Sequence, residues 1–419
     1  MRIAAIALAL LPMTLLMVAC AATSKLDAVA ERYVKLVLAV GRHDDMYVDA
    51  YYGPPAWKTE AERGDPVPLP ELLTRARVLR DELEEISAGP ADRKRFLLKQ
   101  VIAIETHLRR LSGESMTLAA EARGLYDVEA PRHDVSEFAA AHAKLEALVP
   151  GVGPLGPRIE ALRKAVHIPP AAVEKTLRLA LDAARAATAP FVKLPATESF
   201  ETVLVAHKPW GAYNWYLGNF KSRIELNTDL PTELNGLLGT MCHEGYPGHH
   251  VYNVLLEDRL VKKLGYVEFT VYPLYSPQSL LAEGSANVGI DVVFTDDEKR
   301  RVLTQMLGPA AGVPAEAILA LDRLHDALEP LKYVRGEATR MLLDDGVPED
   351  QVVAFVERWA LINTDKAKKA VQFSRAYRSY VFNYSLGEDV VRKWIGTGPD
   401  RRDRFFDLLS RPAVPSDLE

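Results

Sequence analysis

One segment combines a helical pattern with a group of metal-binding side chains: residues 234–250 read LNGLLGTMCHEGYPGHH. Its apolar positions recur at the spacing of one helical face, and the segment 228–231 just upstream (Thr-Asp-Leu-Pro) offers a cap and an early-helix proline. The apolar residues on this face are Leu234, Leu237, Leu238 and Met241. Three of the ten histidines of the chain fall within residues 243–250. The sequence therefore predicts a helix that runs directly into a cluster of imidazoles.

The spacing of these histidines differs from the usual zinc-hydrolase signature HExxH, which places two histidines four residues apart on one helical face. Here the fourth position after His243 is Pro247. A proline removes a helical hydrogen bond and clashes with the preceding turn, so we expect a two-residue bulge at Tyr246-Pro247 that brings His249 to the place of the second histidine. His250 stays an alternative ligand, because in an unbroken helix it would lie only about 20° around the axis from His243.

A catalytic zinc site uses three protein ligands and a water molecule, so a further ligand from a nearby helix is expected. Glu283 is the best candidate, since it begins a plausible second helix 34 residues beyond His249. Asn287 follows one turn later and is expected to steady a ligand histidine through its amide. Cys242 is expected to be a buried thiol, because consecutive helical residues point about 100° apart. The competing carboxylates are Glu257, Asp258 and Asp291, the first two of which are expected on a solvated helix face.

The pattern His243-Glu244-x-x-Pro247-Gly248-His249-His250, with the downstream pair Glu283-Gly284, resembles the bacterial HExxPGHH family of zinc metallopeptidases, long catalogued as a domain of unknown function. The similarity extends over most of the mature chain, including residues 272–279 and 384–387. More distantly, the order of His, Glu, His and a later Glu is similar to gluzincins of the thimet oligopeptidase and angiotensin-converting enzyme type. This resemblance implies a mainly helical zincin-like fold with a deep cleft, bound Zn²⁺ and a peptide substrate. The chain departs from the family at Ser285, where the family commonly has tryptophan, and this departure concerns the substrate more than the metal.

The residue types favour hydrolysis as the chemistry. Glu244 is expected to take a proton from a zinc-bound water that attacks an amide carbonyl. The developing oxyanion needs another donor besides the metal, and the tyrosine- and arginine-rich segment 373–384 offers one. The candidates in order are Tyr384, Tyr380 and Arg375, each of which is equally well explained as a residue at the edge of the core.

Two other functions stay open. The same metal site would serve hydrolysis of a non-peptide amide or ester. A third possibility is a lipoprotein whose site has lost catalysis and serves binding or assembly, but the presence of Glu244 argues against it, because an inactive site has no chemical need for a base beside a ligand.

The rest of the chain predicts a mainly helical fold with a small antiparallel sheet just before the metal-binding helix. Apolar stripes at helical spacing occupy the first 190 residues, starting near Leu26, Leu72, Val101, Phe138 and Ala171. Residues 202–227 are rich in Val, Trp and Tyr, which favours two or three short strands. The strand over residues 220–227 is expected either to offer an edge to an extended substrate or to pack as a hairpin on the cleft wall.

Composition and charge narrow the class of protein. The chain has 419 residues, of which 48% are hydrophobic and 26% charged, enough to bury a large core. The net charge of -6, from 51 basic and 57 acidic residues, lacks the basic excess that nucleic-acid binding needs.

The N-terminus predicts export. Arg2 precedes an apolar run that ends in small residues before Cys20, the layout of a lipoprotein signal peptide over residues 1–19. The run is interrupted by Pro12 and is short for a membrane span. We therefore expect lipidation of Cys20 and a membrane-anchored protein facing the periplasm or the cell exterior. The mature chain, 20–419, is expected to form one catalytic unit, in which residues 24–190 form a helical wall and residues 191–419 carry the metal site.

Overall fold

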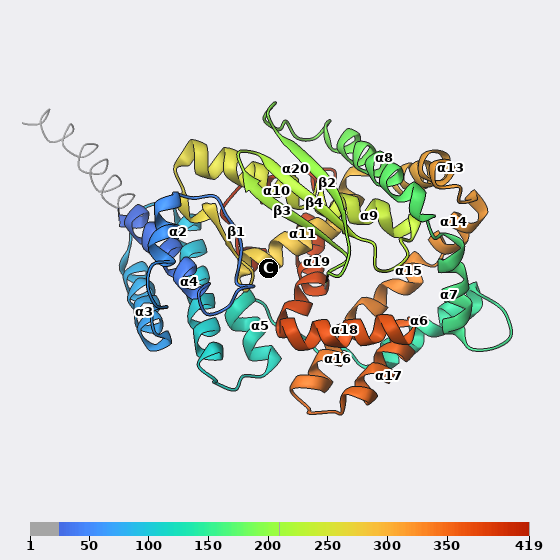
Figure 1. Cartoon of the computed structure of the whole chain (residues 1–419), viewed down its shortest axis with the longest axis horizontal. Coiled ribbons are helices and arrows are strands. Elements are labelled where there is room, and N and C mark those ends of the chain that lie inside the picture. Colours follow the sequence, from blue (N-terminus) through green and yellow to red (C-terminus); the bar gives the residue numbers. More distant parts are fainter. Residues whose placement is uncertain (1–24, 209, 419) are drawn as a thin grey trace, which may run out of the picture.

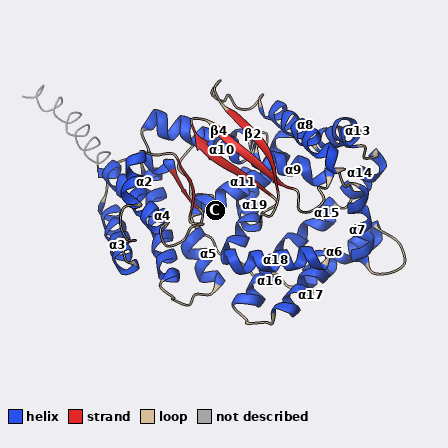
Figure 2. Cartoon of the chain, viewed as in Figure 1, coloured by secondary structure: helices blue, strands red, loops and turns tan. Residues whose placement is uncertain are grey.

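The computed structural model describes residues 25–208 and 210–418, which are mainly helical, as the sequence predicts (Figure 2). The predicted signal peptide and Cys20 lie outside the described residues. Within the described part, no helix is both long and apolar enough to span a lipid bilayer.

The first half of the chain forms a series of amphipathic helices. In α3, Leu72, Ala76, Leu79 and Leu83 repeat at helical spacing and are all buried, and a proline occupies its first turn. The helices after residues 25–40 are α2 (Pro55–Ala61), α3 (Leu69–Glu85), α4 (Ala91–Leu111), α5 (Leu118–Tyr126), α6 (Val135–Leu148), α7 (Leu155–Ala165) and α8 (Pro170–Thr188). The predicted apolar stripes lie in the helix over residues 25–40 and in α3, α4, α6 and α8.

The second half contains the predicted metal-binding helix and the longer helices that surround it. Its α-helices are α9 (Leu234–Glu244), α10 (His249–Leu256), α11 (Pro277–Val293), α12 (Asp296–Arg301), α13 (Gly308–Ala311), α14 (Ala315–Asp322), α15 (His325–Leu328), α16 (Val334–Leu343), α17 (Glu349–Ala360), α18 (Thr364–Tyr377), α19 (Phe382–Ile395) and α20 (Arg401–Leu408). Short π-helical segments cover Glu257–Lys262 and Val302–Leu307, and 3-10 turns cover Val267–Thr270, Glu329–Tyr333, Arg378–Val381 and Pro415–Asp417.

The helix that carries the histidines begins later than predicted. α9 starts at Leu234, with Glu233 as its N-cap, and the 228–231 segment lies outside it. The reason is a tertiary contact: His167 forms an isolated antiparallel bridge with Glu233, and the Leu234 N–H donates to the Val166 carbonyl. These contacts hold the chain extended up to the first turn of α9.

The predicted strands form a three-stranded sheet above α9, α10 and α11 (Figure 1). Its strands are β2 (Ser199–Val205), β3 (Ala212–Gly218) and β4 (Lys221–Asn227), in the order β2-β4-β3. β3 and β4 form an antiparallel hairpin, but β2 runs parallel to β4, so the sheet is mixed and not purely antiparallel. β4 is the central strand, which corrects the prediction that it offers a free edge; β3 is an edge strand of this sheet.

A second, two-stranded sheet was not predicted. β1 (Val48–Tyr51) pairs antiparallel with β5 (Val271–Pro273) and so joins the two halves of the chain. Strands this short carry too few residues for an alternating pattern to be recognised in the sequence.

α11 runs through the centre of the molecule (Figure 1), and most of its residues are buried. Ser276 caps it by accepting a hydrogen bond from the Ser279 N–H, and Pro277 occupies its first turn. It crosses α19 at a contact between two glycines: a Cβ on Gly284 would lie 2.2 Å from the Gly387 carbonyl. The crossing therefore requires glycine, and it brings the start of α19 against the polar side chains of α11.

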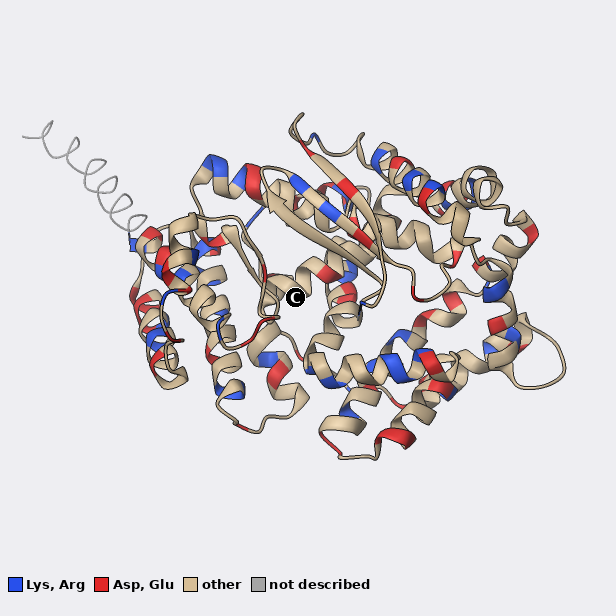
Figure 3. Cartoon of the chain, in the orientation of Figure 1, with Lys and Arg blue, Asp and Glu red and all other residues tan. Residues whose placement is uncertain are grey.

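Charged residues of both signs lie along the outer helices (Figure 3), in keeping with a net charge of only -6 on 108 charged residues, 51 basic and 57 acidic. The mixed surface has the composition expected of a globular protein in water.

Candidate metal centre

The helix that carries His243 ends abruptly after Glu244, and a new helix starts at His249. The predicted two-residue bulge takes the form of a non-helical stretch over residues 245–248. Across it the Val251 N–H reaches the Gly245 carbonyl, two residues further back than in an α-helix. The Gly248 N–H donates to the Cys242 carbonyl at 3.0 Å, which turns the chain back. A Cβ on Gly248 would lie 1.9 Å from the His243 carbonyl oxygen, so only glycine fits the turn.

The break brings together the three side chains predicted as ligands. Nε2 of His243 lies 3.0 Å from Nε2 of His249, and the two nitrogens lie 3.3 and 3.6 Å from the carboxylate oxygens of Glu283. Ligands at about 2.0–2.1 Å in a tetrahedron are about 3.3 Å from one another. One nitrogen of each histidine and a carboxylate oxygen of Glu244 also lie within 4.8 Å of one another. The donor set and its spacing therefore fit a zinc ion.

The outer hydrogen bonds orient these side chains. Asn287, one turn after Glu283 on α11, lies with Oδ1 2.9 Å from Nδ1 of His243. This contact favours the tautomer whose Nε2 carries a free lone pair. The Asn287 amide donates in turn to the Tyr384 carbonyl at 2.9 Å. The structure thus places Asn287 where the sequence predicts it, behind a candidate ligand.

The two carboxylate oxygens of Glu283 differ in their hydrogen bonding. Tyr380 donates its hydroxyl to Oε1 at 2.8 Å, whereas Oε2 is buried without a hydrogen-bond partner among the described residues. A buried acceptor without a partner costs about 1–3 kcal/mol, and this one lies beside the imidazole nitrogen of His243. A metal ion bound there would satisfy it.

His250 does not face the other two histidines. Its Nδ1 lies 2.7 Å from Oγ of Ser222, and its Nε2 lies 2.9 Å from a carboxylate oxygen of Glu198. Both ring nitrogens are therefore occupied, and the ring is fully buried under the sheet. The structure does not bring His250, the alternative ligand, to the candidate metal centre.

The ionisable groups of the centre perturb one another strongly. Burial, opposed by His243 and reinforced by Glu283, raises the pKa of Glu244 to about 7. Burial disfavours the charged form of His243, but the carboxylate of Glu283, 3.3 Å away, and that of Glu244 outweigh it and raise the pKa of His243 to about 9. Burial lowers the pKa of His249 to about 4, against the field of Glu283. The imidazoles and carboxylates thus form one coupled group, as expected for a functional site.

The centre lies in the wall of a cavity of about 220 Å³. Glu244 lines it and is 6% exposed. Segments from both halves of the chain form the walls: residues 45–49, residues 210–215 of the sheet edge, and aromatic side chains of α18 and α19. The first half of the chain thus contributes to the cavity through the loop before β1 and through β1 itself.

Two of the three predicted donors lie at the cavity. Tyr380 and Tyr384 both line it, and their rings meet edge to face at a centroid distance of 5.7 Å. Arg375 does not line it, since it is exposed and forms an ion pair with Glu349 at 2.6 Å. Arg375 was predicted only because it stands in a segment rich in tyrosine and arginine. On α18 its side chain points away from the cavity.

The other sequence candidates lie elsewhere. Cys242 is a buried free thiol, as predicted, and burial raises its pKa. Glu257 is buried and not on a solvated face: it accepts hydrogen bonds from the Tyr216 hydroxyl and from the N–H groups of residues 219 and 220, which fixes the β3–β4 turn. Asp258 pairs with Lys263 at 2.6 Å.

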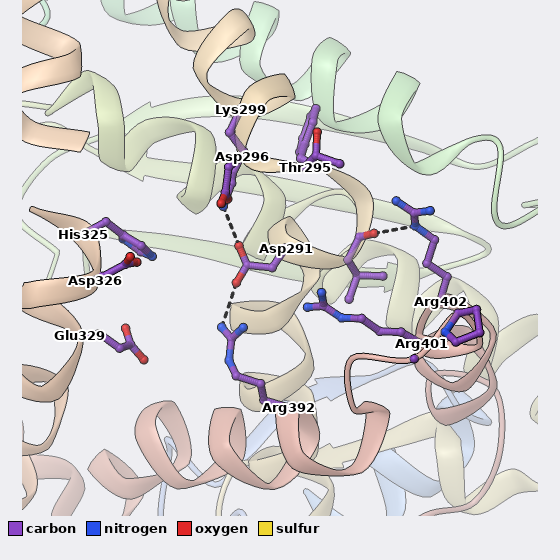
Figure 4. Close-up of a pocket in the computed structure, with 14 residues that line it drawn as sticks. Asp291, Thr295, Asp296, Lys299, His325, Asp326, Glu329, Arg392, Arg401 and Arg402 are labelled. Atoms are coloured by element: carbon purple, nitrogen blue, oxygen red, sulfur yellow. Dashed lines mark hydrogen bonds and ion pairs between the residues drawn. The ribbon is translucent and has the colours of Figure 1, made fainter. Parts of the chain in front are cut away.

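Asp291 belongs to a second hollow, of about 610 Å³ (Figure 4). It accepts from Lys299 and Arg392, at 2.9 Å each, and ties α11 to α12 and α19. The hollow is lined by about as many acidic as basic side chains, so its charge does not single out a ligand.

Several residues at the cavity were not predicted. Asp49 lines it from β1, and the Tyr213 hydroxyl donates to its carboxylate. Asn214 donates to the Glu244 carbonyl at 2.7 Å, while its own Oδ1 is buried without a partner among the described residues. None of these residues belongs to a recognisable spacing, so no sequence signal identified them.

The fold of this chain is similar to that of a protein of known structure. No family model matches the sequence, and no curated protein is similar enough to match. Among solved structures, the chain is similar to "the putative lipoprotein from Colwellia psychrerythraea", with a TM-score of 0.52 and 15% sequence identity, over 84% of this chain and 68% of that one. At this identity the likeness concerns the fold alone.

Proposed function

We propose that this protein is a zinc-dependent hydrolase that cleaves peptides. The observation that carries the proposal is the convergence of His243, His249 and Glu283 at 3.0–3.6 Å, with the Glu244 carboxylate beside them in the cavity wall. Two imidazoles and one carboxylate are the ligand set of catalytic zinc sites that leave a coordination position open.

The residues around the centre have separate tasks. When bound, zinc would act as a Lewis acid and would lower the pKa of a water molecule. Glu244 would accept a proton and pass it to the leaving amine, which suits a carboxyl whose pKa is raised to about 7. Tyr384 and Tyr380 carry hydroxyls at the cavity, and burial raises the pKa of both well above the usual range. Both would therefore stay protonated. The Tyr384 hydroxyl would act as hydrogen-bond donor to a developing oxyanion, whereas the single hydroxyl proton of Tyr380 is already donated to Glu283.

A peptide is favoured as substrate by the strand beside the centre. β3 is an edge of its sheet, and its residues 212–215 line the cavity. An exposed strand edge binds an extended backbone by adding it to the sheet. Asn214, on the same strand, holds the end of α9 through the Glu244 carbonyl, so a bound backbone would lie close to the candidate base.

We further propose that the mature protein is held on the outer side of a bacterial membrane by a lipid on Cys20. This proposal rests on the sequence of residues 1–20. Incorporation of a radiolabelled fatty acid into the wild-type protein, and its loss in Cys20→Ser, is the expected result. Labelling that persists in the variant would contradict it.

The hydrolase proposal is tested on the purified mature protein by metal analysis and by digestion of a mixed peptide library. We expect one zinc per chain in the wild type and in Glu244→Gln, little zinc in His243→Ala, and cleavage only by the wild type. A wild-type protein without stoichiometric metal would contradict the proposal. Cleavage of other amides or esters but of no peptide would favour the alternative substrate class, and metal without any hydrolysis would favour a binding protein.

A further inference from the structure

The carboxylate of Asp49 differs from the buried carboxylates elsewhere in the protein. Outside the candidate metal centre, every buried glutamate of the described residues has a lysine or arginine partner within ion-pair distance. These glutamates are Glu105, Glu121, Glu225, Glu257, Glu268, Glu337 and Glu388. Asp49, half-buried in the cavity wall, has a neutral partner instead, the hydroxyl of Tyr213. The fold thus holds a carboxylate in place without supplying a cation to it.

The cavity has no lysine or arginine among the described residues that line it. Four of these residues are acidic: Asp45, Asp49, Glu244 and Glu283. A divalent ion at the candidate centre would contribute two positive charges against these four carboxylates. With all four ionised, the cavity would keep a negative charge with metal bound, and a positively charged group would be attracted into it.

Aromatic rings surround Asp49. Tyr213, which positions the carboxylate, packs against Trp215 and Trp210 at centroid distances of 4.5 and 5.1 Å. Tyr272 and Tyr377 line the same cavity as Asp49. Aromatic faces beside a carboxylate form the environment that binds organic cations, through ion pairing and cation–π attraction.

We propose that Asp49, with the aromatic rings around it, is a subsite for a primary ammonium group of the substrate. The proposal rests on the proposed function, since it assigns a substrate class to the same cavity. An α-ammonium at a peptide N-terminus and the ε-ammonium of a lysine side chain share this chemistry. Asp49 and Glu244 line the same cavity. An ammonium bound at Asp49 would therefore determine which amide bond of the substrate lies beside the candidate base.

The negative charges in the cavity link the ionisation of Asp49 to the binding of a cation. Burial, with the negative charges of Glu283 and Glu244, raises the pKa of Asp49 to about 8. A bound cation favours the ionised carboxylate, so ammonium binding and ionisation of Asp49 would reinforce each other.

Binding is measured by calorimetry on the zinc-loaded mature Glu244→Gln protein, so that no turnover interferes. The first pair of probes is Leu-Leu amide and its N-acetyl form, which tests an α-ammonium. The second pair is N-acetyl-Lys-Leu amide and N-acetyl-norleucyl-Leu amide, which tests an ε-ammonium. A charge-assisted hydrogen bond contributes about 1.5–3 kcal/mol, so we expect the charged member of one pair to bind about ten- to a hundredfold more tightly. The pair that shows the preference identifies the source of the ammonium.

Asp49→Asn in the same background is expected to abolish that preference while the zinc content is unchanged. The matched control is Asp258→Asn, which removes a carboxylate paired with Lys263 outside the cavity and should leave the preference intact. If Asp49→Asn is poorly folded, Tyr213→Phe, which keeps the carboxylate and removes its donor, should reduce the preference several-fold.

Equal binding of charged and uncharged probes by the parent protein, or a preference that survives Asp49→Asn, would overturn the ammonium subsite. Failure to bind any probe would overturn it as well. An ammonium preference in a protein whose wild type hydrolyses no peptide would instead contradict the hydrolase proposal and leave the subsite standing. The two proposals can therefore fail separately.

Discussion

His249 and His250 are neighbours in the sequence but have different environments. His249 points its Nε2 to His243 and Glu283, whereas His250 has both nitrogens occupied by Ser222 and Glu198. The sequence favours His249 over His250, but only the break between the helices explains why the two rings diverge. The residue next to a candidate ligand thus supports the sheet through Ser222.

This difference gives the first prediction. His249→Ala should lose most bound zinc, because it removes a ligand. His250→Ala should keep one zinc per chain but lose stability by about 1–3 kcal/mol, since it leaves the buried Glu198 with fewer partners. Metal content by mass spectrometry and urea unfolding monitored by circular dichroism measure the two effects. Loss of zinc in His250→Ala with zinc retained in His249→Ala would show that the alternative ligand is the correct one.

Asn287 gives the second prediction, because it touches a candidate ligand without being one. Its Oδ1 fixes the ring of His243, and loss of such a partner typically weakens zinc affinity 10- to 100-fold. We expect this loss for Asn287→Ala in competition titrations with a chromophoric chelator. The control is Asn235→Ala, whose amide donates to the Ile318 carbonyl and should leave zinc affinity unchanged. Equal affinity of Asn287→Ala and the wild type would contradict the positioning role.

At the scale of single residues, the sequence predicted those side chains that belong to a recognisable motif or helical spacing. His243, Glu244 and His249 belong to one short motif, Glu283 and Asn287 stand one helical turn apart on α11, and the structure brings the two groups together. Asp49 and Tyr213 come from strands far apart in the chain, and Arg375 was chosen from composition alone. Such residues depend on tertiary packing and side-chain direction, which no local pattern specifies.

Among the elements, the crossing of α11 and α19 determines the shape of the centre. It places Tyr380 against Glu283 and the Tyr384 carbonyl against Asn287. The helices themselves were predictable from apolar periodicity, but the crossing depends on one glycine from each helix, Gly284 and Gly387. Similarly, the strands were predictable from β-branched and aromatic residues, whereas the parallel pairing of β2 with β4 was not, because order and direction within a sheet are set by the connections.

The third prediction concerns this crossing. Gly284→Ala would place a methyl group 2.2 Å from the Gly387 backbone, so the helices must separate. We expect a loss of stability of about 1–3 kcal/mol or more and weaker zinc binding, because Glu283 moves with α11. Gly236→Ala in α9 is the matched control: nothing lies within 4 Å of its Cβ position, and alanine is favoured over glycine in a helix by up to about 1 kcal/mol.

Urea unfolding and chelator competition on both variants provide the measurement. Equal stability of Gly284→Ala and Gly236→Ala would show that α11 and α19 can separate without cost. In that case the crossing would not position the centre.

Over the whole molecule, the two halves of the chain are joined by contacts that the sequence did not reveal. β1 pairs with β5, and the fully buried guanidinium of Arg93 in α4 pairs with the buried carboxylate of Glu268 at 2.6 Å. Breaking a buried pair by removing one partner costs about 3–5 kcal/mol, because a charge is left unpaired.

The fourth prediction follows from this ion pair. Arg93→Met should lower the free energy of unfolding by that amount and should shift the whole unfolding transition, as one cooperative unit, when both near-UV and far-UV signals are followed in urea. The exposed pair of Arg178 with Glu174 offers the control, and Arg178→Met should change stability by less than about 1 kcal/mol. Two separate transitions in Arg93→Met would show that the halves fold independently.

The last prediction concerns the metal as a link between elements. Its candidate ligands come from three helices, α9, α10 and α11, so an ion bound to the folded state alone would stabilise their arrangement in proportion to the logarithm of its concentration over Kd. Removing metal with a chelator should lower Tm, and adding zinc back should restore it in the wild type and in Glu244→Gln, since Glu244 is not required as a ligand. His243→Ala should show no zinc-dependent shift, although its apo form should melt near the apo wild type. A zinc-induced rise in Tm that is equally large in His243→Ala would mean that the ion binds elsewhere. The proposed metal site between α9, α10 and α11 would then be wrong.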